Sequence, residues 1–277
     1  MSHLDHVAAT PSAQPCVTAM HAVAPLMRLS NISKAFGAAP VLTRIDLDIF
    51  TGQTLGLIGP NGAGKTTLFN ILSGFLHADS GTIEFDGQDI ARLSAQSRAQ
   101  AGVLRTFQKS LVFGSLSVRA NVAMAARVIS GTGYTWRGAG KASRDAQVRA
   151  DALLEQADMQ SRAQSLACDL SYGEQRILDV LMALAQTPRV LLLDEPTAGL
   201  SEQESARLLA IVGQHHAQTA VVLVSHDIDV VFATCERIAV LDLGVLIAVD
   251  TPQAIRDDVR VRAAYLGMAT DDEEQRS

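Results

Sequence analysis

One nine-residue loop constrains the fold of this chain more than any other part of its sequence. The run GPNGAGKTT begins after a short apolar stretch at 54–58 and opens into the helix-like run TTLFNILSGF. It fits the pattern G-x-x-x-x-G-K-[ST], whose glycines let backbone N–H groups turn inward around phosphate oxygens. Its strand–loop–helix context predicts a nucleotide site, and a chance glycine turn is the alternative. In chain order the loop consists of Gly59, Pro60, Asn61, Gly62, Ala63, Gly64, Lys65, Thr66 and Thr67.

Two side chains of this loop are suited to contact a nucleoside triphosphate and its metal ion. Lys65 supplies a positive charge to the β- and γ-phosphates, and Thr66 offers a hydroxyl to Mg²⁺. We therefore expect ATP or a related nucleotide, together with Mg²⁺, as the ligands of this loop.

An apolar run that ends in two acidic residues supplies the complement to the loop. In VLLLDEPTAGL, Asp194 stands at the end of a predicted strand and Glu195 follows it. Carboxylate oxygens suit Mg²⁺, which makes Asp194 a candidate metal ligand. Glu195 is the candidate general base that accepts a proton from attacking water. The alternative is that both carboxylates cap the start of the next helix.

Three further residues are candidates because of where they stand in the chain. His226 follows its own apolar strand, where it would either contact the γ-phosphate and position water or form a structural cap together with the Asp that follows it. Gln108, in RTFQ, precedes a helical region and is either a catalytic residue and Mg²⁺ ligand or an exposed polar residue. Phe36, in KAFG, either stacks on an adenine ring or packs in the core.

The stretch CDLSYGEQRIL predicts a helix start with a specific end structure. Ser171 and Glu174 are three residues apart, just ahead of an apolar-periodic run, and this spacing is typical of a capping box. A helix N-terminus approached through Gly173 is also suited to bind an anion such as phosphate. The stretch by itself does not decide between a capped helix and a phosphate site.

The remaining hydrophobic pattern predicts an α/β fold. The alternation in RIDLDIF indicates a half-buried strand, and Asp86–Gly87 indicates a hairpin turn between two short strands. Apolar runs that alternate with helices imply a parallel sheet covered on both faces. Residues at about 110–187 read as mostly helical, an insert that ends at Thr187–Pro188. Within it, the glycine-rich loop 130–141 is expected to be a mobile surface loop, with contact to a membrane surface as the alternative.

Composition and the chain ends exclude several classes of function. The formal net charge is −6, with 8 Phe, 3 Tyr and 1 Trp, which disfavours a nucleic-acid partner. The sequence contains no run of 18 apolar residues, so we expect no membrane span. Residues 1–25 lack a basic start and an apolar run, so we expect a disordered lead-in rather than a secretion signal. The acidic end, 268–277, is expected to be disordered. The cysteines have no metal-ligand spacing.

In this order and spacing, the motifs resemble those of the ATP-binding subunits of ABC transporters. The resemblance spans about 26–267 and implies a P-loop NTPase core, an antiparallel β edge subdomain and an α-helical subdomain at about 110–187. In that family two ATPase subunits pair head to tail, and each signature motif closes over ATP held by the other subunit. The motifs that carry the resemblance are Phe36, GPNGAGKTT, Gln108, LSYGEQ, VLLLDEP and His226.

The signature of this chain consists of Leu170, Ser171, Tyr172, Gly173 and Glu174. It departs from the family pattern at two of these five positions. The usual Gly-Gly pair is Tyr172–Gly173, and the usual Gln is Glu174. A carboxylate beside phosphate is unfavourable unless it caps the helix, as its spacing suggests. Ser201 also stands where the family commonly has Asp, which puts the contact of that loop across the dimer in question.

Within the family, the chain is most similar to the ATPases of branched-chain amino acid importers. GVLRTFQ, the 130–141 loop and the ending VRVRAAYLG carry this resemblance. It implies a homo- or heterodimer of ATPase chains, two membrane permease subunits and a solute-binding protein, with this chain peripheral on the cytoplasmic side of the inner membrane. Urea or short-chain amide importers and lipopolysaccharide or lipid exporters are the alternatives, and a nucleotide-gated regulatory module without transport is a further one.

Overall fold

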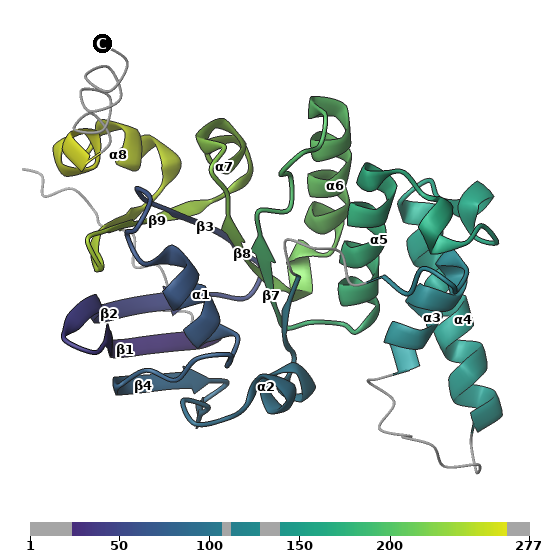
Figure 1. The fold of residues 1–277 in the computed structure, drawn as a ribbon, viewed down its shortest axis with the longest axis horizontal. Helices are drawn as coiled ribbons and strands as arrows, with labels where there is room; N and C mark the ends of the chain where they lie inside the picture. The colour runs from purple at the N-terminus through teal and green to yellow at the C-terminus, as the bar shows by residue number, and fades with distance from the viewer. Residues whose placement is uncertain (1–23, 107–111, 128–138, 265–277) are drawn as a thin grey trace, which may run out of the picture.

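A six-stranded sheet with strand order β10-β9-β3-β8-β7-β6 forms the centre of the molecule (Figure 1). The structure is a computed structural model that describes residues 24–106, 112–127 and 139–264. Four neighbouring pairs of this sheet are parallel, and β10 runs antiparallel to β9. This confirms the parallel sheet predicted from the apolar runs. Its strands are β3 (Thr54–Ile58), β6 (Val103–Arg105), β7 (Val190–Asp194), β8 (Ala220–Val224), β9 (Arg237–Asp242) and β10 (Val245–Asp250).

Helices or strands cover both faces of this sheet, which explains why its central strands are apolar throughout. Every residue of β3 and β8 is buried. Along β7, Leu192 packs into one cluster with the helix after β3, whereas Leu191 and Leu193 pack into a second cluster on the opposite face. The helices of the sheet region are α1 (Lys65–Leu72), α2 (Ala95–Ala101), α6 (Glu202–Gln214), α7 (Ile228–Thr234) and α8 (Pro252–Asp257).

A four-stranded antiparallel sheet, in the order β2-β1-β4-β5, packs its apolar face against α1. Its strands are β1 (Met27–Phe36), β2 (Ala39–Ile49), β4 (Ser80–Phe85) and β5 (Gln88–Asp89). The predicted hairpin is confirmed, because β4 and β5 pair across Asp86 and Gly87. Both turn residues have positive φ, 53° and 75°, as a type I′ turn requires. Helix α1 is therefore enclosed between the two sheets.

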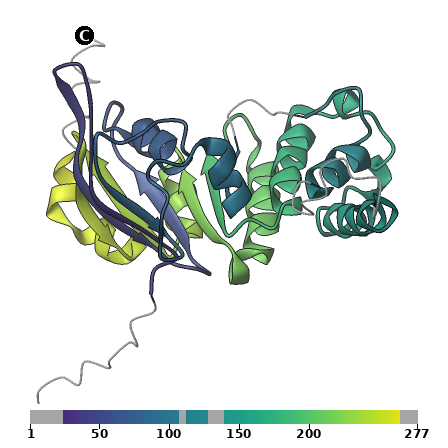
Figure 2. The same cartoon turned by 90° about the horizontal axis from the view of Figure 1, so that it is seen from below.

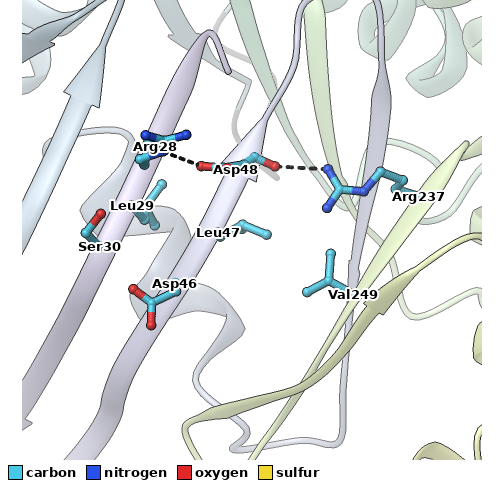
Figure 3. Close-up of a pocket in the computed structure, with 8 residues that line it drawn as sticks. All are labelled: Arg28, Leu29, Ser30, Asp46, Leu47, Asp48, Arg237 and Val249. Carbon is cyan, nitrogen blue, oxygen red and sulfur yellow. Dashed lines mark hydrogen bonds and ion pairs between the residues drawn. The ribbon is translucent and has the colours of Figure 1, made fainter. Parts of the chain in front are cut away.

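An ion-paired hollow marks the junction of the two sheets on the side shown in Figure 3. It measures about 330 Å³ and lies between β1, β2 and the strands β9 and β10. There Asp48 accepts from Arg28 through its side chain at 2.9 Å, and its backbone carbonyl accepts from Arg237 at 3.2 Å. None of the motif residues lines this hollow, so we read it as a structural junction.

Three helices form the end of the molecule opposite the antiparallel sheet (Figures 1 and 2). They are α3 (Val118–Arg127), α4 (Ala139–Gln156) and α5 (Tyr172–Ala185), and they fall inside the region that the sequence marks as helical. The predicted loop 130–141 needs one correction, because α4 already begins at Ala139. Residues 128–138 lie outside the described part of the chain, so the alternatives for this loop are not decided.

Candidate functional site

The glycine loop connects the carboxyl end of β3 to the first turn of α1, as its pattern predicts. Gly64 is the N-cap of α1 with φ 102°, and no side chain accepts a hydrogen bond from the first turn there. A backbone with this φ strongly favours glycine. At Gly59 a Cβ atom would stand 2.0 Å from the carbonyl oxygen of Leu241. The loop therefore depends on both glycines for its close-packed path, and it ends at a helix N-terminus, where backbone N–H groups favour anions.

Lys65 lies over this loop and is buried. Its Nζ donates to the carbonyl oxygens of Gly59 at 2.6 Å and Pro60 at 2.9 Å. Burial lowers the pKa of Lys65, and the negative charge of Glu195 acts in the opposite direction. Thr66, next in the chain, is exposed. A phosphate at the loop would offer the ammonium group charged acceptors in place of two carbonyls.

Asp194 ends β7 and is paired with a residue that sequence reasoning had not singled out. Its Oδ2 accepts from Nη2 of Arg105 at 2.7 Å, and the two side chains are 14% and 8% exposed. Arg105 ends β6, the neighbouring parallel strand, which places both residues at the same edge of the sheet. The sequence feature that could have pointed to Arg105 is that it is a charged residue at the end of an otherwise apolar strand.

Glu195 is buried and held in an unusual backbone conformation with φ 49°. Its N–H donates to the carbonyl of Val224 at 2.9 Å, and its own carbonyl accepts from Nη2 of Arg176 at 2.8 Å. Such a positive φ costs a non-glycine residue about 1–3 kcal/mol, so the surrounding contacts must impose it. Sequence reasoning did not single out Arg176 either. The feature that could have pointed to it is a charged residue within the apolar stripe of a buried helix.

The carboxylate of Glu195 faces His226, which follows β8. The backbone N–H of His226 donates to Oε2 at 3.3 Å, and its ring Nε2 lies 3.3 Å from Oε1. Burial is the main cause that raises the pKa of Glu195, and the charge of Asp194 adds to it. The hydrogen bond and charge of His226 and the charge of Lys65 act in the opposite direction. The site thus holds a carboxyl group with increased proton affinity, which suits a general base.

The capping alternative is wrong for the two acids, whereas for the pair His226–Asp227 it is confirmed at Asp227. The helix after β7 is capped by Ser201, not by Asp194 or Glu195. The helix after β8 is capped by Asp227, whose side chain accepts from the N–H of Val230. Asp194, Glu195 and His226 therefore do not cap these two helices, and they lie where β7 and β8 end at the carboxyl edge of the sheet.

The signature segment begins α5 with the predicted capping box. The N–H of Glu174 donates to the hydroxyl of Ser171 at 3.2 Å, and the N–H of Ser171 donates to the carboxylate of Glu174 at 2.9 Å. Burial alone would raise the pKa of Glu174, but the hydrogen bonds from Ser171 and Arg162 prevail and lower it. Leu170 is buried ahead of the cap. The carboxylate of Glu174, which replaces the usual Gln of the family, therefore caps its own helix.

Tyr172, the other departure within the signature, packs against the loop that follows Glu195. The hydroxyl of Tyr172 donates to the carbonyl of Ala198 at 3.2 Å, and a Cβ on Gly199 would stand 3.2 Å from the tyrosine ring. A Cβ on Gly173 would stand 2.0 Å from the Glu204 carboxylate, so a larger residue there would require that side chain to move. The signature segment is therefore joined, within one chain, to the loop that follows Glu195.

The structure describes Phe36 but not Gln108, the two remaining candidate residues. Phe36 ends β1 with 53% of its surface exposed, so the alternative that it packs in the core is wrong. The Nζ of Lys34 lies 5.6 Å from the centre of its ring, which leaves aromatic surface for a stacked base. Gln108 lies outside the described residues.

The donors expected for Mg²⁺ are few. Among residues 24–106, 112–127 and 139–264, no cluster of three or more His, Cys, Asp or Glu side chains is placed to hold a metal ion. Mg²⁺ at nucleotide sites takes one or two protein oxygens together with phosphates and waters. Asp194 fits this chemistry, because Arg105 uses only its Oδ2.

Comparison with known families identifies the family to which this chain belongs. Residues 42–198, more than half of the chain, match the family model described as ABC transporter. The chain belongs to the ABC transporter family. It is accordingly an ATP-binding ATPase subunit, as its motifs predicted. Residues 245–267 also match the model described as branched-chain amino acid ATP-binding cassette transporter.

Individual relatives agree with this assignment. The high-affinity branched-chain amino acid transport ATP-binding protein LivG of Escherichia coli K12 is 35% identical over 255 residues, covering 88% of this chain and 99% of LivG. The lipopolysaccharide export system ATP-binding protein LptB of Haemophilus influenzae is 30% identical over 243 residues, covering 87% of this chain and 97% of LptB.

A solved structure supports the fold. The ADP conformation of MJ1267, an ATP-binding cassette of an ABC transporter, superposes with a TM-score of 0.75 at 24% identity and covers 88% of this chain and 100% of its own. This confirms the predicted fold class. In the described part of the chain, no helix is both long enough and apolar enough to cross a membrane.

Proposed function

We propose that this chain powers the import of branched-chain amino acids through separate membrane permease subunits. The observation that carries the proposal is the match of residues 245–267 to the branched-chain amino acid model, which lies outside the general ABC match. The 35% identity to LivG along nearly its whole length supports the same substrate class. Export of lipopolysaccharide is the second candidate, favoured by the 30% identity to LptB.

Each residue of the site has a role in ATP hydrolysis under this proposal. The N–H groups of the glycine loop and Lys65 bind the phosphates, and Phe36 stacks on the adenine. Glu195 accepts a proton from the attacking water, and its pKa, raised by burial, suits that task. His226, beside that carboxylate, orients the water and the γ-phosphate.

Mg²⁺ supplies electrostatic stabilisation of the charge that develops on the transferring phosphoryl group. Thr66 and Asp194 are its proposed protein partners, and Gln108 is a further proposed ligand. The other contacts would come from the nucleotide and from water, as is usual for this ion.

Two such subunits form the working unit in this proposal, either two copies or this chain with a sister ATPase. Ser171 and Gly173, at the N-terminus of α5, bind the γ-phosphate of ATP held by the partner subunit. ATP thus favours the closed pair, and hydrolysis removes that preference. The permease subunits follow this closing and opening, a solute-binding protein delivers the amino acid, and this chain is peripheral on the cytoplasmic side of the inner membrane.

The test is uptake in cells that lack this chain. Radiolabelled leucine uptake should be lost and then restored by the wild-type chain, but not by Glu195→Gln. Glu202→Gln, which removes a carboxylate from the exposed first turn of α6, serves as the matched control and should restore uptake. Normal leucine uptake without the chain, together with loss of lipopolysaccharide from the cell surface, would replace import by the export candidate.

A further inference from the structure

Arg105 connects three elements around the carboxylate proposed to serve the metal ion. From the end of β6 its Nη2 donates to Asp194 at 2.7 Å, while its Nη1 donates to Asn70 at 2.6 Å and Ser73 at 3.1 Å. Asn70 lies within α1, and Ser73 is the residue at which α1 ends. The guanidinium also stands 5.3 Å from the ring centre of Phe69. The buried guanidinium of Arg105 thus connects α1, the helix that follows the glycine loop, to β7, the strand that carries Asp194.

This arrangement restricts the carboxylate in direction and in charge. Because Arg105 holds Oδ2, the Asp194 side chain loses the freedom to rotate, and Oδ1 is the oxygen left for a metal ion or its bound water. Because the pair is only 8% and 14% exposed, water screens the guanidinium weakly. A nearby divalent cation would therefore be attracted by Asp194 and repelled by Arg105 at the same time.

We propose that Arg105 is a positioning residue that fixes Asp194 for catalysis and, by its charge, weakens the hold of the site on the divalent cation. A weaker hold lets the cation leave together with the product nucleotide. The inference rests on the proposed role of Asp194 at the metal ion, and it assigns a role to Arg105, for which the sequence motifs gave none.

Loss of Arg105 should change metal binding and turnover in opposite directions. Without its positive charge, the metal ion is repelled less and binds more tightly. Without its hydrogen bonds, Asp194 is no longer held in one orientation, and turnover falls. A variant that is merely damaged would lose affinity and turnover together, so this opposition separates positioning from structural support.

The experiment measures Mn²⁺ binding by electron paramagnetic resonance to the full chain loaded with ADP, alongside ATPase turnover with Mg²⁺. Arg105→Gln should bind Mn²⁺ at least threefold more tightly and turn over at least tenfold more slowly than wild type. Arg119→Gln is the control, because it removes an Arg–Asp pair on the helical part of the molecule, with Asp151. It should change neither quantity.

A second variant keeps the test decisive if Arg105→Gln fails to fold. Arg105→Lys retains the charge but lacks the planar fork that reaches both Asp194 and α1. It should bind Mn²⁺ within twofold of wild type and still turn over at least fivefold more slowly. Unchanged turnover in this lysine variant, or Mn²⁺ binding by Arg105→Gln that is equal to or weaker than wild type, would overturn the inference.

Asp194→Asn separates this inference from the proposal on which it rests. If Asp194 serves the metal ion, the asparagine variant should bind Mn²⁺ at least tenfold more weakly. Unchanged binding would refute the proposed metal site itself. Weakened binding in Asp194→Asn, with no tightening in Arg105→Gln, would refute only the role of Arg105.

Discussion

Arg176 donates a hydrogen bond from its buried guanidinium to the backbone carbonyl of Glu195 at 2.8 Å. The two residues belong to different motifs, since Arg176 lies in the first turns of the signature helix and Glu195 follows β7. The contact stabilises the backbone of Glu195, which has a positive φ. The signature helix and the candidate base are therefore mechanically joined within a single chain.

Replacement of Arg176 by methionine should reduce ATP turnover by about tenfold or more while ATP binding is retained. The substitution keeps the apolar bulk but leaves the Glu195 carbonyl without its charged donor, so the backbone relaxes from φ 49°. Turnover and the dissociation constant of a fluorescent ATP analogue check this expectation.

Arg149→Met provides the matched control for that variant. Arg149 also donates to a backbone carbonyl at 2.8 Å, that of Leu184, but at the far end of α5. It should lower the free energy of unfolding by about 1–3 kcal/mol and leave turnover within about twofold of wild type. Equal losses of turnover in both variants would show that Arg176 matters only for stability.

Glu195→Gln should lower turnover by at least about a hundredfold, the usual range for loss of a general base. Because the amide has nearly the shape of the carboxylate, nucleotide binding should persist, and the ATP-bound chains should stay paired. Turnover assays and size-exclusion chromatography with and without ATP check both points. Near-normal turnover would remove Glu195 from the role of base.

Glu174→Gln, which restores the residue usual in the family, should destabilise the chain by about 0.5 kcal/mol at pH 7. The folded state lowers the pKa of Glu174 below its ordinary 4.5, because the carboxylate accepts from Ser171 and Arg162. Its contribution is therefore complete above about pH 4.5 and is lost as the pH falls through the lower folded-state pKa.

Thermal unfolding of wild type and Glu174→Gln across this range measures the effect. The difference in melting temperature should be constant from pH 7 to pH 5 and should shrink below that. A glutamine variant that is as stable as wild type at pH 7 would mean that the carboxylate charge contributes nothing to the cap.

Arg98→Met should lower the free energy of unfolding by about 3 kcal/mol or more. Arg98 is fully buried, and its guanidinium donates to the carbonyls of Ile71 and Leu72 at the end of α1, at 2.5 Å and 2.9 Å. Burial lowers its pKa to about 10, so the group stays charged at neutral pH. Its removal leaves the carbonyls of Ile71 and Leu72, in the last turn of α1, without their charged donor.

Urea unfolding checks this value, with the exposed Arg92→Met as control. The control should stay within about 0.5 kcal/mol of wild type. A similar small effect at Arg98 would contradict the view that α1 depends on this residue.

The features that the sequence determined are those whose interacting groups are neighbours in the chain. The glycine loop is one, because its residues are consecutive and Gly64 adopts a φ of 102° that strongly favours glycine. The capping box of Ser171 and Glu174 is another, with partners three residues apart. The Asp86–Gly87 hairpin follows the same rule. The parallel sheet was also predictable, because strands covered on both faces must be apolar throughout.

Only the tertiary structure decided which charged side chains meet. Arg105 and Asp194 are 89 residues apart, and Arg176 and Glu195 are 19 apart, so no local pattern links them. The exposure of Phe36 and the contact of Tyr172 with the loop after Glu195 depend in the same way on how distant elements pack. A hydrophobic pattern specifies that a strand or helix is buried, but the partner of a buried charge is fixed only when separate elements come together.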